Sequence, residues 1–389
     1  MKILIVAKDP THQTNAGNRY VILTQAEKLK SLGLEVHFLY IEERPLKKER
    51  WPEYDRDLAL TADYWKERFH LYRVGRLQKF LFNLLYRFRM AFCHFQEGVD
   101  DHYPCGLTHF VNRLDAKMHF DICLIHYYDL SRLLTRIHIP VKALMTHDCF
   151  AYKNLVVGER ILHINAHSEA KAMQRADAIF AIQEEEAAYF SLLAPRSRVY
   201  DIFSIYSYHP QKIAGNHDIV FLSGPNRFNI NGIKWFVKEI FPAILTRFPD
   251  AQLLIGGRIC RELPEFKGMP GISLEGSVDS PELFYAKADI AINPVYQGTG
   301  LKIKTLEAVS YDKVTIVHPH SMRGLYDKAH APMLVAENAS EWLSHLEKVW
   351  GDRDVIASIK LADAEYMESM QRFIDEEYQR FLKDITIDK

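Results

Sequence analysis

A glycine-rich turn that leads into a helix holds the residues of this chain best suited to chemistry. The segment from Gly298 to Ala308 reads GTGLKIKTLEA and directly follows an apolar run, 288–295, that predicts a buried strand. Glycines let an anion approach the backbone, and the free N–H groups that begin a helix attract its charge. Glu307 can accept paired hydrogen bonds from vicinal hydroxyls, such as those of a ribose. The segment therefore predicts a site for a nucleoside diphosphate. The alternative is a turn that needs glycine only for its geometry, with Glu307 as a solvated helix carboxylate.

Polar residues also follow two predicted strands in the first half of the chain. His147 and Asp148 come directly after the strand 143–146, and His126 follows the apolar stretch 122–125. Ligands of α/β proteins bind at the carboxyl ends of strands, so we expect His147 to lie near a ligand site, with His126 as a weaker candidate. Asp148 is expected to orient His147 or to cap the next helix. The alternative for each histidine is a hydrogen-bonded structural residue.

The elements that must position these residues begin at the N-terminus. A strand at 2–7 and a strand at 36–41 enclose a helical pattern, which is typical of a parallel α/β sheet. Gly17, Asn18 and Arg19 lie where the first strand turns into this helix, and we expect them to face phosphate or an acidic acceptor. Alternatively, Gly17 only starts the helix and Arg19 lies on its exposed face.

The same alternation continues along the chain and restarts near residue 219. Further strands are predicted at 122–126, 143–146, 178–182, 219–222, 252–255, 272–274, 289–293 and 314–318. The fold class is therefore α/β, with two Rossmann-like domains facing a central cleft. The predicted domains are 1–205, on the acceptor side, and 216–361, which contains the glycine-rich turn. A charged helix at 362–389 is expected to cross back to the first domain.

Composition excludes several classes of protein. The 389 residues carry a formal net charge of −1, so no global field favours nucleic acid. Five scattered cysteines without a CxxC pair argue for reduced thiols in a cytoplasmic protein and against a zinc module. The first apolar run is too short for a signal peptide, and no segment has the roughly 18 apolar residues that suggest a membrane span.

Residues 45–110 form an insertion rich in aromatic and basic residues. Its segments 65–73 and 79–89 have apolar spacing compatible with helices, and its basic residues are Arg73, Arg76, Lys79, Arg87 and Arg89. One interpretation is peripheral membrane contact through 65–92, or a basic surface for a lipid-linked or acidic acceptor. The other is a helical hairpin packed on the first domain, with arginine stems covering apolar surface.

The two-domain organisation and the motifs of the second half resemble the GT-B glycosyltransferases, in particular the retaining, family-4-like group (glycosyl transferases group 1). Residues 224–236, GPNRFNINGIKWF, resemble the Asn-rich loop and helix that open the donor domain of these enzymes. Residues 254–258 resemble its next strand and glycine turn, and 276–278 with 288–290 resemble the segment that holds the nucleobase. Residues 298–307 resemble the family branch written GTGxKxKxLEA.

The chain departs from the family pattern at two places. Many members carry a second glutamate eight positions before the one at Glu307, where it contacts the transferred sugar, and this position is Thr299 here. Many also place an Arg and a Lys on the diphosphate, close after the first donor-domain strand. Arg227 is present in this chain, but the Lys is not in its usual position, so Arg258 or Lys302 is expected to supply the second charge.

The resemblance, taken with the residue patterns, implies a set of site residues. The expected catalytic residues are His147, Asp148 and Glu307. The expected substrate-binding residues are Gly17, Asn18, Arg19, His126, Arg227, Asn229, Arg258, Val278, Gly298, Thr299, Gly300, Leu301, Lys302 and Glu307. Asn229 and Asn231 are alternatively caps of a helix that starts at Gly232. No metal ligands and no cofactor are expected beyond the nucleotide-sugar donor.

The function implied is retaining, metal-independent transfer of a sugar from a nucleotide sugar to a glycan or lipid-linked acceptor in bacterial surface polysaccharide synthesis. The protein is expected to be cytoplasmic, or peripheral at the inner face of the membrane. Two alternatives remain open. One is a GT-B sugar-nucleotide epimerase, and the other is a non-catalytic GT-B subunit, which the missing glutamate at Thr299 would fit.

Overall fold

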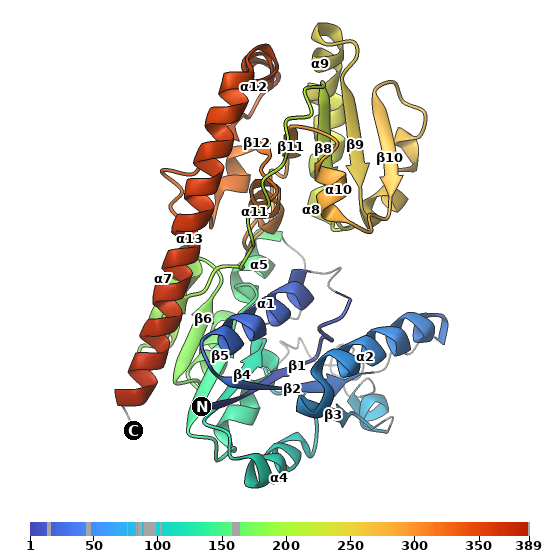
Figure 1. The fold of residues 1–389 in the computed structure, drawn as a ribbon. Helices are drawn as coiled ribbons and strands as arrows, with labels where there is room; N and C mark the ends of the chain where they lie inside the picture. The colour runs from blue at the N-terminus through green and yellow to red at the C-terminus, as the bar shows by residue number, and fades with distance from the viewer. Residues whose placement is uncertain are drawn as a thin grey trace. The chain divides into compact units, whose positions relative to one another are not determined.

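The computed structural model describes residues 1–13, 17–43, 48–75, 77–82, 84, 88, 99–101, 103–157 and 164–387. The chain forms two compact units, each built on its own parallel sheet with helices packed around it (Figure 1). The first unit contains Met1–Ile205 together with the chain from Glu376 onward, and the second contains Tyr206–Asp375. The predicted α/β class with two Rossmann-like units is confirmed.

The sheet of the first unit has the order β3-β2-β1-β4-β5-β6-β7, and all its neighbouring strands are parallel. Its strands are β1 (Lys2–Ala7), β2 (Glu35–Glu42), β3 (Phe69–Arg73), β4 (Ile122–His126), β5 (Val141–Met145), β6 (Ala178–Ala181) and β7 (Arg198–Asp201). The central strands are continuous apolar runs because helices cover both faces of a parallel sheet.

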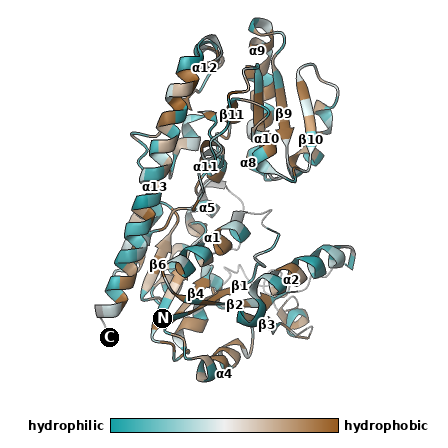
Figure 2. Ribbon diagram, in the orientation of Figure 1, coloured by the Kyte–Doolittle hydropathy of each residue, from teal (hydrophilic) through white to brown (hydrophobic). Residues whose placement is uncertain are grey.

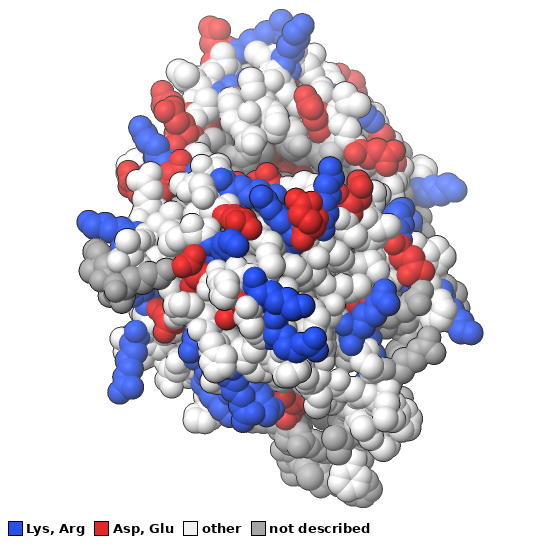
Figure 3. Space-filling model, turned by 60° about the horizontal axis from the view of Figure 1, so that its bottom comes forward, with Lys and Arg blue, Asp and Glu red and all other residues white. Residues whose placement is uncertain are grey.

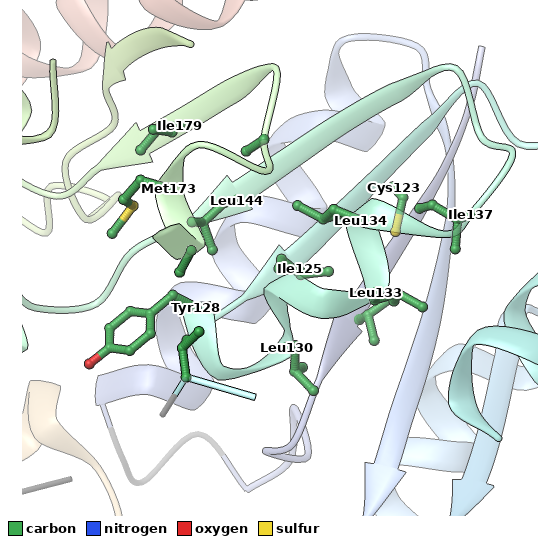
Figure 4. Close-up of a cluster of buried hydrophobic side chains, with 14 of the residues drawn as sticks. Cys123, Ile125, Tyr128, Leu130, Leu133, Leu134, Ile137, Leu144, Met173 and Ile179 are labelled. Atoms are coloured by element: carbon green, nitrogen blue, oxygen red, sulfur yellow. The ribbon is translucent and has the colours of Figure 1, made fainter. Parts of the chain in front are cut away.

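The helices of the first unit connect these strands. They are α1 (Gly17–Ser31), α2 (Trp51–Trp65), α4 (Leu107–Met118), α5 (Phe150–Val157), α6 (Ala166–Met173) and α7 (Glu184–Leu193), with a 3₁₀ segment η3 (Tyr128–Thr135). Ile125 of β4 and Leu144 of β5 pack with Leu133 and Leu134 of η3 in one buried cluster (Figure 4). This cluster fixes the carboxyl ends of β4 and β5 on the sheet.

The insertion differs from its prediction over residues 65–73. Instead of continuing as a helix, α2 ends at Trp65, and Phe69–Arg73 forms the edge strand β3 beside β2. Pairing with the exposed edge of β2 satisfies backbone groups that a helix would otherwise satisfy locally, and aromatic residues such as Phe69 and Tyr72 suit a strand. Much of the segment 79–89, including Arg87 and Arg89, lies outside the described residues, as does Arg76.

The sheet of the second unit has the order β10-β9-β8-β11-β12-β13, again parallel throughout. Its strands are β8 (Asp218–Leu222), β9 (Gln252–Gly256), β10 (Ile272–Gly276), β11 (Ile290–Asn293), β12 (Val314–Val317) and β13 (Leu334–Val335). Its helices are α8 (Arg227–Trp235), which runs through a π-helical turn (Phe236–Ile240) into α9 (Phe241–Arg247), then α10 (Pro281–Tyr285), α11 (Ile303–Ser310), α12 (Ala339–Gly351) and α13 (Arg353–Ile387). Figure 2 shows that the strands of both sheets are mainly hydrophobic.

Two helix starts differ from the sequence prediction. The helix expected from Gly232 begins five residues earlier, at Arg227, because the side chain of Asn226 accepts hydrogen bonds from the N–H groups of Phe228 and Asn229. The C-terminal helix begins at Arg353 and not at residue 362. In both cases apolar residues before the predicted start, such as Ile230 in α8 and Ile356 in α13, already pack on the core of the second unit, so the sequence analysis placed both helix starts too late.

Candidate functional site

The strand order of the second unit places its candidate site. The order 3-2-1-4-5-6, counted from β8, reverses between β8 and β11, which pair directly. The connections after these two strands leave the sheet in opposite directions, and the space at their carboxyl ends is where doubly wound sheets bind ligands. The loop 223–226, which leads into the Asn-containing helix α8, follows β8, and the glycine-rich loop 294–302 follows β11. Both predicted segments are therefore brought to this one edge.

Close packing holds α8 against the loop after β11. A side chain at Gly232 would lie 2.9 Å from the carbonyl oxygen of Pro294, so only glycine fits there. Gly298 has a φ of +104°, and a Cβ on it would lie 3.0 Å from the ring of Phe228. Gly300 also has a positive φ, of +74°. The glycines of the GTG segment are thus required by backbone geometry as well as by any ligand.

Lys302 stabilises this loop from within the chain. Its ammonium donates to the carbonyl oxygens of Thr299 and Gly300, at 3.2 and 3.1 Å. The ring of His320 contacts the carbonyl oxygen of Gly298 at 2.9 Å, and burial lowers the pKa of this histidine to about 4. A neutral His320 donates this hydrogen bond without adding charge. The diphosphate contact expected of Lys302 stays a prediction. Its hydrogen bonds to Thr299 and Gly300 show that Lys302 also has a structural role in the loop.

Lys304 and Glu307 form the charged centre of the site, and the sequence analysis did not single out Lys304. The two residues are three positions apart on α11, so they share a face of the helix. The ammonium of Lys304 donates to Oδ1 of Asn229 at 2.9 Å, and the amide of Asn229 donates to the carbonyl oxygen of Gly224 at 3.1 Å. Asn229 therefore links the loop after β8 to the first turn of α11, a contact that a helix cap would not provide. The sequence signal for Lys304 was its i, i+3 spacing to Glu307.

Burial shifts the titration of this pair toward neutrality. It lowers the pKa of Lys304 to about 8, against the opposing attraction of Glu307. It raises the pKa of Glu307 to about 7, and Lys304 opposes this shift. Each group is half-buried, and the attraction between the two opposes the loss of charge that burial favours, which makes the pair a candidate functional site.

Other predicted residues of the second unit lie around this edge. Val278 packs against the end of β9, where a Cβ on Gly256 would lie 2.8 Å from its side chain. Arg258 is exposed at the start of a 3₁₀ turn that follows Gly257, and Arg227 is exposed in the first turn of α8. Leu301 is buried. The hydroxyl of Thr299 is buried and has no hydrogen-bond partner within the described part of the chain.

The first unit repeats the same topology, with its reversal between β1 and β4. His126, the last residue of β4, places Nδ1 at 2.9 Å from Nε2 of His147, which follows β5. The ring of Tyr127 stacks on His147 with centroids 4.0 Å apart. Burial lowers the pKa of His147 to about 3. Burial, together with the neighbouring His147, holds the pKa of His126 well below its usual range. The pair is neutral, suited to hydrogen bonding with hydroxyls.

Among the described residues, the Asp148 carboxylate makes no hydrogen bond or ion pair with either histidine. Its carboxylate pairs with the ammonium of Lys153 on α5, and its other oxygen has no partner among the described residues. The expectation that Asp148 orients His147 is therefore wrong, since His126 and Tyr127 perform that role. The capping expectation also fails, because the N–H of Phe150 in the first turn of α5 donates to Glu169, at 2.8 Å. A residue that follows a strand end can face several neighbours, and sequence alone does not choose among them.

The turn after β1 brings Gly17, Asn18 and Arg19 to the same edge of this sheet. Gly17 starts α1, and Arg19 donates to the buried carboxylate of Asp57 at 2.6 Å, so the exposed-face alternative for Arg19 is wrong. Burial raises the pKa of Asp9, while Arg19 and a hydrogen bond from Asn18 oppose the shift.

Two residues of this turn were missed by the sequence analysis. Asp9 is one, and the other is Lys8, whose ammonium lies 2.7 Å from Asp129 and 3.3 Å from Glu43. Burial lowers the pKa of Lys8, but the two carboxylates raise it more, to about 12. The signal for both residues was their position directly after a buried strand.

Charge and composition of the described residues add two observations. No group of three or more His, Cys, Asp or Glu side chains that could hold a metal ion occurs among the residues that the structure covers. None of the described helices combines the length and the apolarity needed to cross a bilayer. Lys and Arg side chains gather in several groups on the face shown in Figure 3, so the near-neutral chain has locally basic surface.

Comparison with known proteins agrees with this arrangement. Residues 216–352 match the family described as glycosyl transferases group 1. A protein of Klebsiella pneumoniae, named as an uncharacterised 44.6 kDa protein in the cps region, is 21% identical over 348 residues, which cover 79% of this chain and 80% of the relative.

Solved structures extend the likeness to the whole chain. Sucrose-phosphate synthase of Thermosynechococcus elongatus is similar over 100% of both chains, with a TM-score of 0.68 and 14% identity. The HepE protein of Anabaena, solved with UDP-glucose, gives a TM-score of 0.64 and 10% identity over 98% of this chain and 100% of its own. The family match and the fold likeness lead to one conclusion: residues 216–352 match the group 1 glycosyltransferases, and the two units together have the GT-B fold of these solved structures.

Proposed function

We propose that this protein is a glycosyltransferase that transfers a sugar from a nucleoside-diphosphate sugar to a glycan or lipid-linked acceptor, with retention of configuration and without a metal ion. The observation that carries the proposal is the Lys304–Glu307 pair on α11, held by Asn229 at the reversal point of the second sheet. An ammonium beside a helix N-terminus suits a diphosphate, and a carboxylate one turn further suits ribose hydroxyls. The expected nucleotide contacts of Arg227, Arg258 and Val278 belong to the same proposal.

The reaction needs the leaving group to be stabilised more than it needs a base. The bond between the anomeric carbon and the β-phosphate oxygen breaks, and its electron pair leaves with the nucleoside diphosphate. The acceptor oxygen then bonds to the anomeric carbon on the same face, and its proton passes to the departing phosphate. Lys304 and the N–H groups at the start of α11 would neutralise the negative charge that develops on the departing phosphate. Such electrostatic stabilisation usually lowers the reaction barrier more than any other single effect. These donors support a reaction without metal.

The neutral histidines of the first unit complete the proposal on the sugar side. His147, oriented by His126 and stacked on Tyr127, would hydrogen-bond a hydroxyl of the transferred sugar without charging. The buried hydroxyl of Thr299 is available to a sugar at the position where many relatives carry glutamate. A UDP donor is favoured because HepE and the pneumococcal transferase GtfA were solved with UDP or a UDP-sugar. The cps-region relative supports a role in bacterial surface polysaccharide.

A two-step experiment tests this function. The full chain is first screened for thermal stabilisation by UDP, GDP and ADP, and we expect UDP to raise Tm. UDP release from UDP-sugars is then followed with and without bacterial lipid extract and with EDTA, and the product's anomeric configuration is read by NMR. Release that the extract accelerates and EDTA leaves unchanged supports the proposal. Thermal stabilisation by a nucleotide without release of UDP would instead favour a non-catalytic subunit. Recovery of the donor with a different sugar would favour an epimerase. If no nucleotide raises Tm, the proposed site is wrong.

A further inference from the structure

The helical segment that begins after Gly75 has its apolar side chains on the outside. Residues 77–82 and 84 are helical, and the N–H of Lys79 donates to the carbonyl oxygen of Gly75 at 3.1 Å. Leu77, Phe80, Leu81 and Leu84 are 72, 62, 47 and 53% exposed. Their spacing of i, i+3, i+4 and i+7 places them on one face of the helix. We call these four residues the apolar stripe.

The opposite face of the segment is turned toward the protein and combines the polar Gln78 and Lys79 with the half-buried Phe82. Gln78 and Lys79 are half-buried, and the amide nitrogen of Gln78 is fully buried, with no hydrogen-bond partner within the described residues. Burial lowers the pKa of Lys79, while Glu43 and Glu42 nearby raise it. A helix on the surface of a protein in water has the reverse arrangement, with its apolar face against the core. Four exposed apolar side chains on one face therefore favour an apolar partner over water for the stripe.

The charge of the surrounding sequence distinguishes between two possible partners of the stripe, a second copy of the chain and a lipid bilayer. From Arg73 to residue 92 the sequence carries five basic residues and no acidic residue. Arg73 ends the edge strand β3, and its side chain is 72% exposed although it also pairs with Glu42. A second copy of the chain, docked through the same patch by a two-fold axis, would bring these like charges together. The headgroups of an anionic bilayer would neutralise them, while its acyl region would receive the stripe.

We propose that the apolar stripe is a membrane-docking surface that inserts into the interface of a bilayer containing anionic lipid. The stripe lies in the interfacial plane, and Arg73 contacts the headgroups beside it. The proposal concerns residues outside both candidate site edges, so it does not depend on the identity of the donor. It places the enzyme where an acceptor carried on a lipid would be presented.

Vesicle flotation of the full chain tests the surface directly. The wild-type protein should float with vesicles of equal parts phosphatidylglycerol and phosphatidylcholine and less with phosphatidylcholine alone. Raising the salt concentration should weaken binding to the anionic vesicles, because salt screens the attraction between basic residues and anionic headgroups. The double variant Phe80→Ser, Leu84→Ser should partition at least about tenfold less, because two exposed apolar side chains no longer enter the interface. The matched control is Leu192→Ser with Leu361→Ser, two exposed leucines elsewhere, which should float like the wild type.

Several outcomes would overturn this inference. They are failure of the wild-type protein to bind anionic vesicles, equal loss in both double variants, and a wild-type dimer without vesicles that Phe80→Ser, Leu84→Ser dissociates. Hydrogen exchange on the bound wild-type protein gives a measurement that needs no variant, and amides 77–84 should gain protection. Because no nucleotide enters these measurements, failure of sugar transfer and failure of docking are distinguishable.

Discussion

At the scale of single residues, the site depends on two groups whose charge is poised near neutral pH. Lys304 has a pKa of about 8 and Glu307 a pKa of about 7, and burial is the main cause of both shifts. A diphosphate prefers the protonated lysine, and ribose hydroxyls prefer the ionised carboxylate as an acceptor. Lys304 is protonated and Glu307 is ionised at the same time mainly between these two pKa values. The affinity for the nucleotide should therefore depend on pH in a way that reflects the titration of both residues.

We expect the affinity for the nucleoside diphosphate to be greatest between about pH 7 and 8 and to fall on either side. Above pH 8 the free protein loses the proton of Lys304, and below pH 7 it protonates Glu307. Lys304→Met should remove the alkaline limb and weaken binding at pH 7.5 about 10- to 100-fold. Glu307→Gln should remove the acid limb while leaving the fold intact. Calorimetric titration at each pH gives both limbs.

Two controls make this prediction specific. The nucleoside without phosphates should keep the acid limb and lack the alkaline one, since it meets Glu307 but offers Lys304 no charge. Lys328→Met removes an exposed lysine of the same unit and should leave the profile unchanged. Identical profiles for the wild-type protein and Lys304→Met would show that Lys304 does not contact the diphosphate.

The predictability of the site also differs residue by residue. Glu307 and the GTG segment could be recognised because a glycine-rich turn between a buried strand and a helix is a typical anion-binding arrangement. Lys304 was overlooked in favour of Lys302, since both are lysines of one short run and only the three-dimensional packing shows which one turns toward Asn229. The failure at Asp148 has the same cause: position after a strand indicates the edge of the sheet but not the neighbour that a side chain selects.

At the scale of elements, the turn after β9 shows how closely strands and loops approach near the donor-side edge. Gly257 has a φ of +97°, and a Cβ on it would lie 2.2 Å from the carbonyl oxygen of Ser223, directly after β8. Gly257→Ala should therefore cost about 3 kcal/mol or more, from backbone strain together with the clash. Gly268→Ala is the matched control, because Gly268 has a φ of +80° but open space around it, and should cost only about 1 to 2 kcal/mol. Equal losses of Tm would mean that the turn relaxes.

The start of α5 shows how buried carboxylates can replace an ordinary cap. Glu169 is fully buried and accepts from the N–H of Phe150, and burial, with Asp148 adding to it, raises its pKa to about 7. A raised pKa adds stability that is complete below the ordinary value of 4.5 and is lost as pH rises through about 7. The loss amounts to roughly 3 kcal/mol over this window.

We expect Glu169→Gln to remove this pH dependence, because the amide oxygen still accepts from Phe150 and cannot ionise. The free energy of opening of β4 and β5, followed by hydrogen exchange from pH 5 to 8, should fall more in the wild-type protein than in the variant. Glu185→Gln, an exposed carboxylate of α7, serves as control and should follow the wild type. Parallel curves for the wild-type protein and Glu169→Gln would show that Glu169 is already ionised in the folded state at low pH.

Elements also differ in how far sequence predicts them. The buried central strands were recognisable from continuous apolar runs, and β4 has its predicted bounds, Ile122–His126. The edge strand β3 was not recognisable from the sequence. A strand at the edge of a sheet lacks a continuous apolar run, and β3 is defined by its pairing with β2. Short strands such as β13, with two residues, carry too little pattern for any prediction.

At the scale of the whole molecule, the division into two units runs through a single helix. The second unit ends at Asp375, inside α13, and the rest of this helix belongs to the first unit. Sequence indicated a long charged helix, but only its contacts show which core each part joins. In the first unit, the N–H of Asp201 donates to Glu377 and the hydroxyl of Tyr200 donates to Asp384, at 2.9 and 2.8 Å.

The last part of α13 should therefore stabilise the first unit selectively. Phe381 is fully buried, with its ring centroid 4.9 Å from that of Phe180 on β6 and 5.5 Å from that of Tyr200 on β7. Phe381→Ala removes this aromatic contact and leaves a cavity, so we expect a loss of about 3 to 5 kcal/mol. Hydrogen exchange should show faster opening of β6 and β7 while β8 and β9 keep their protection. The control is Leu361→Ala, an exposed position of the same helix in the second unit, which should change neither. If Phe381→Ala reduces protection equally in both sheets, α13 couples the two cores into one cooperative structure, and the units defined by their contacts are not separate units of stability.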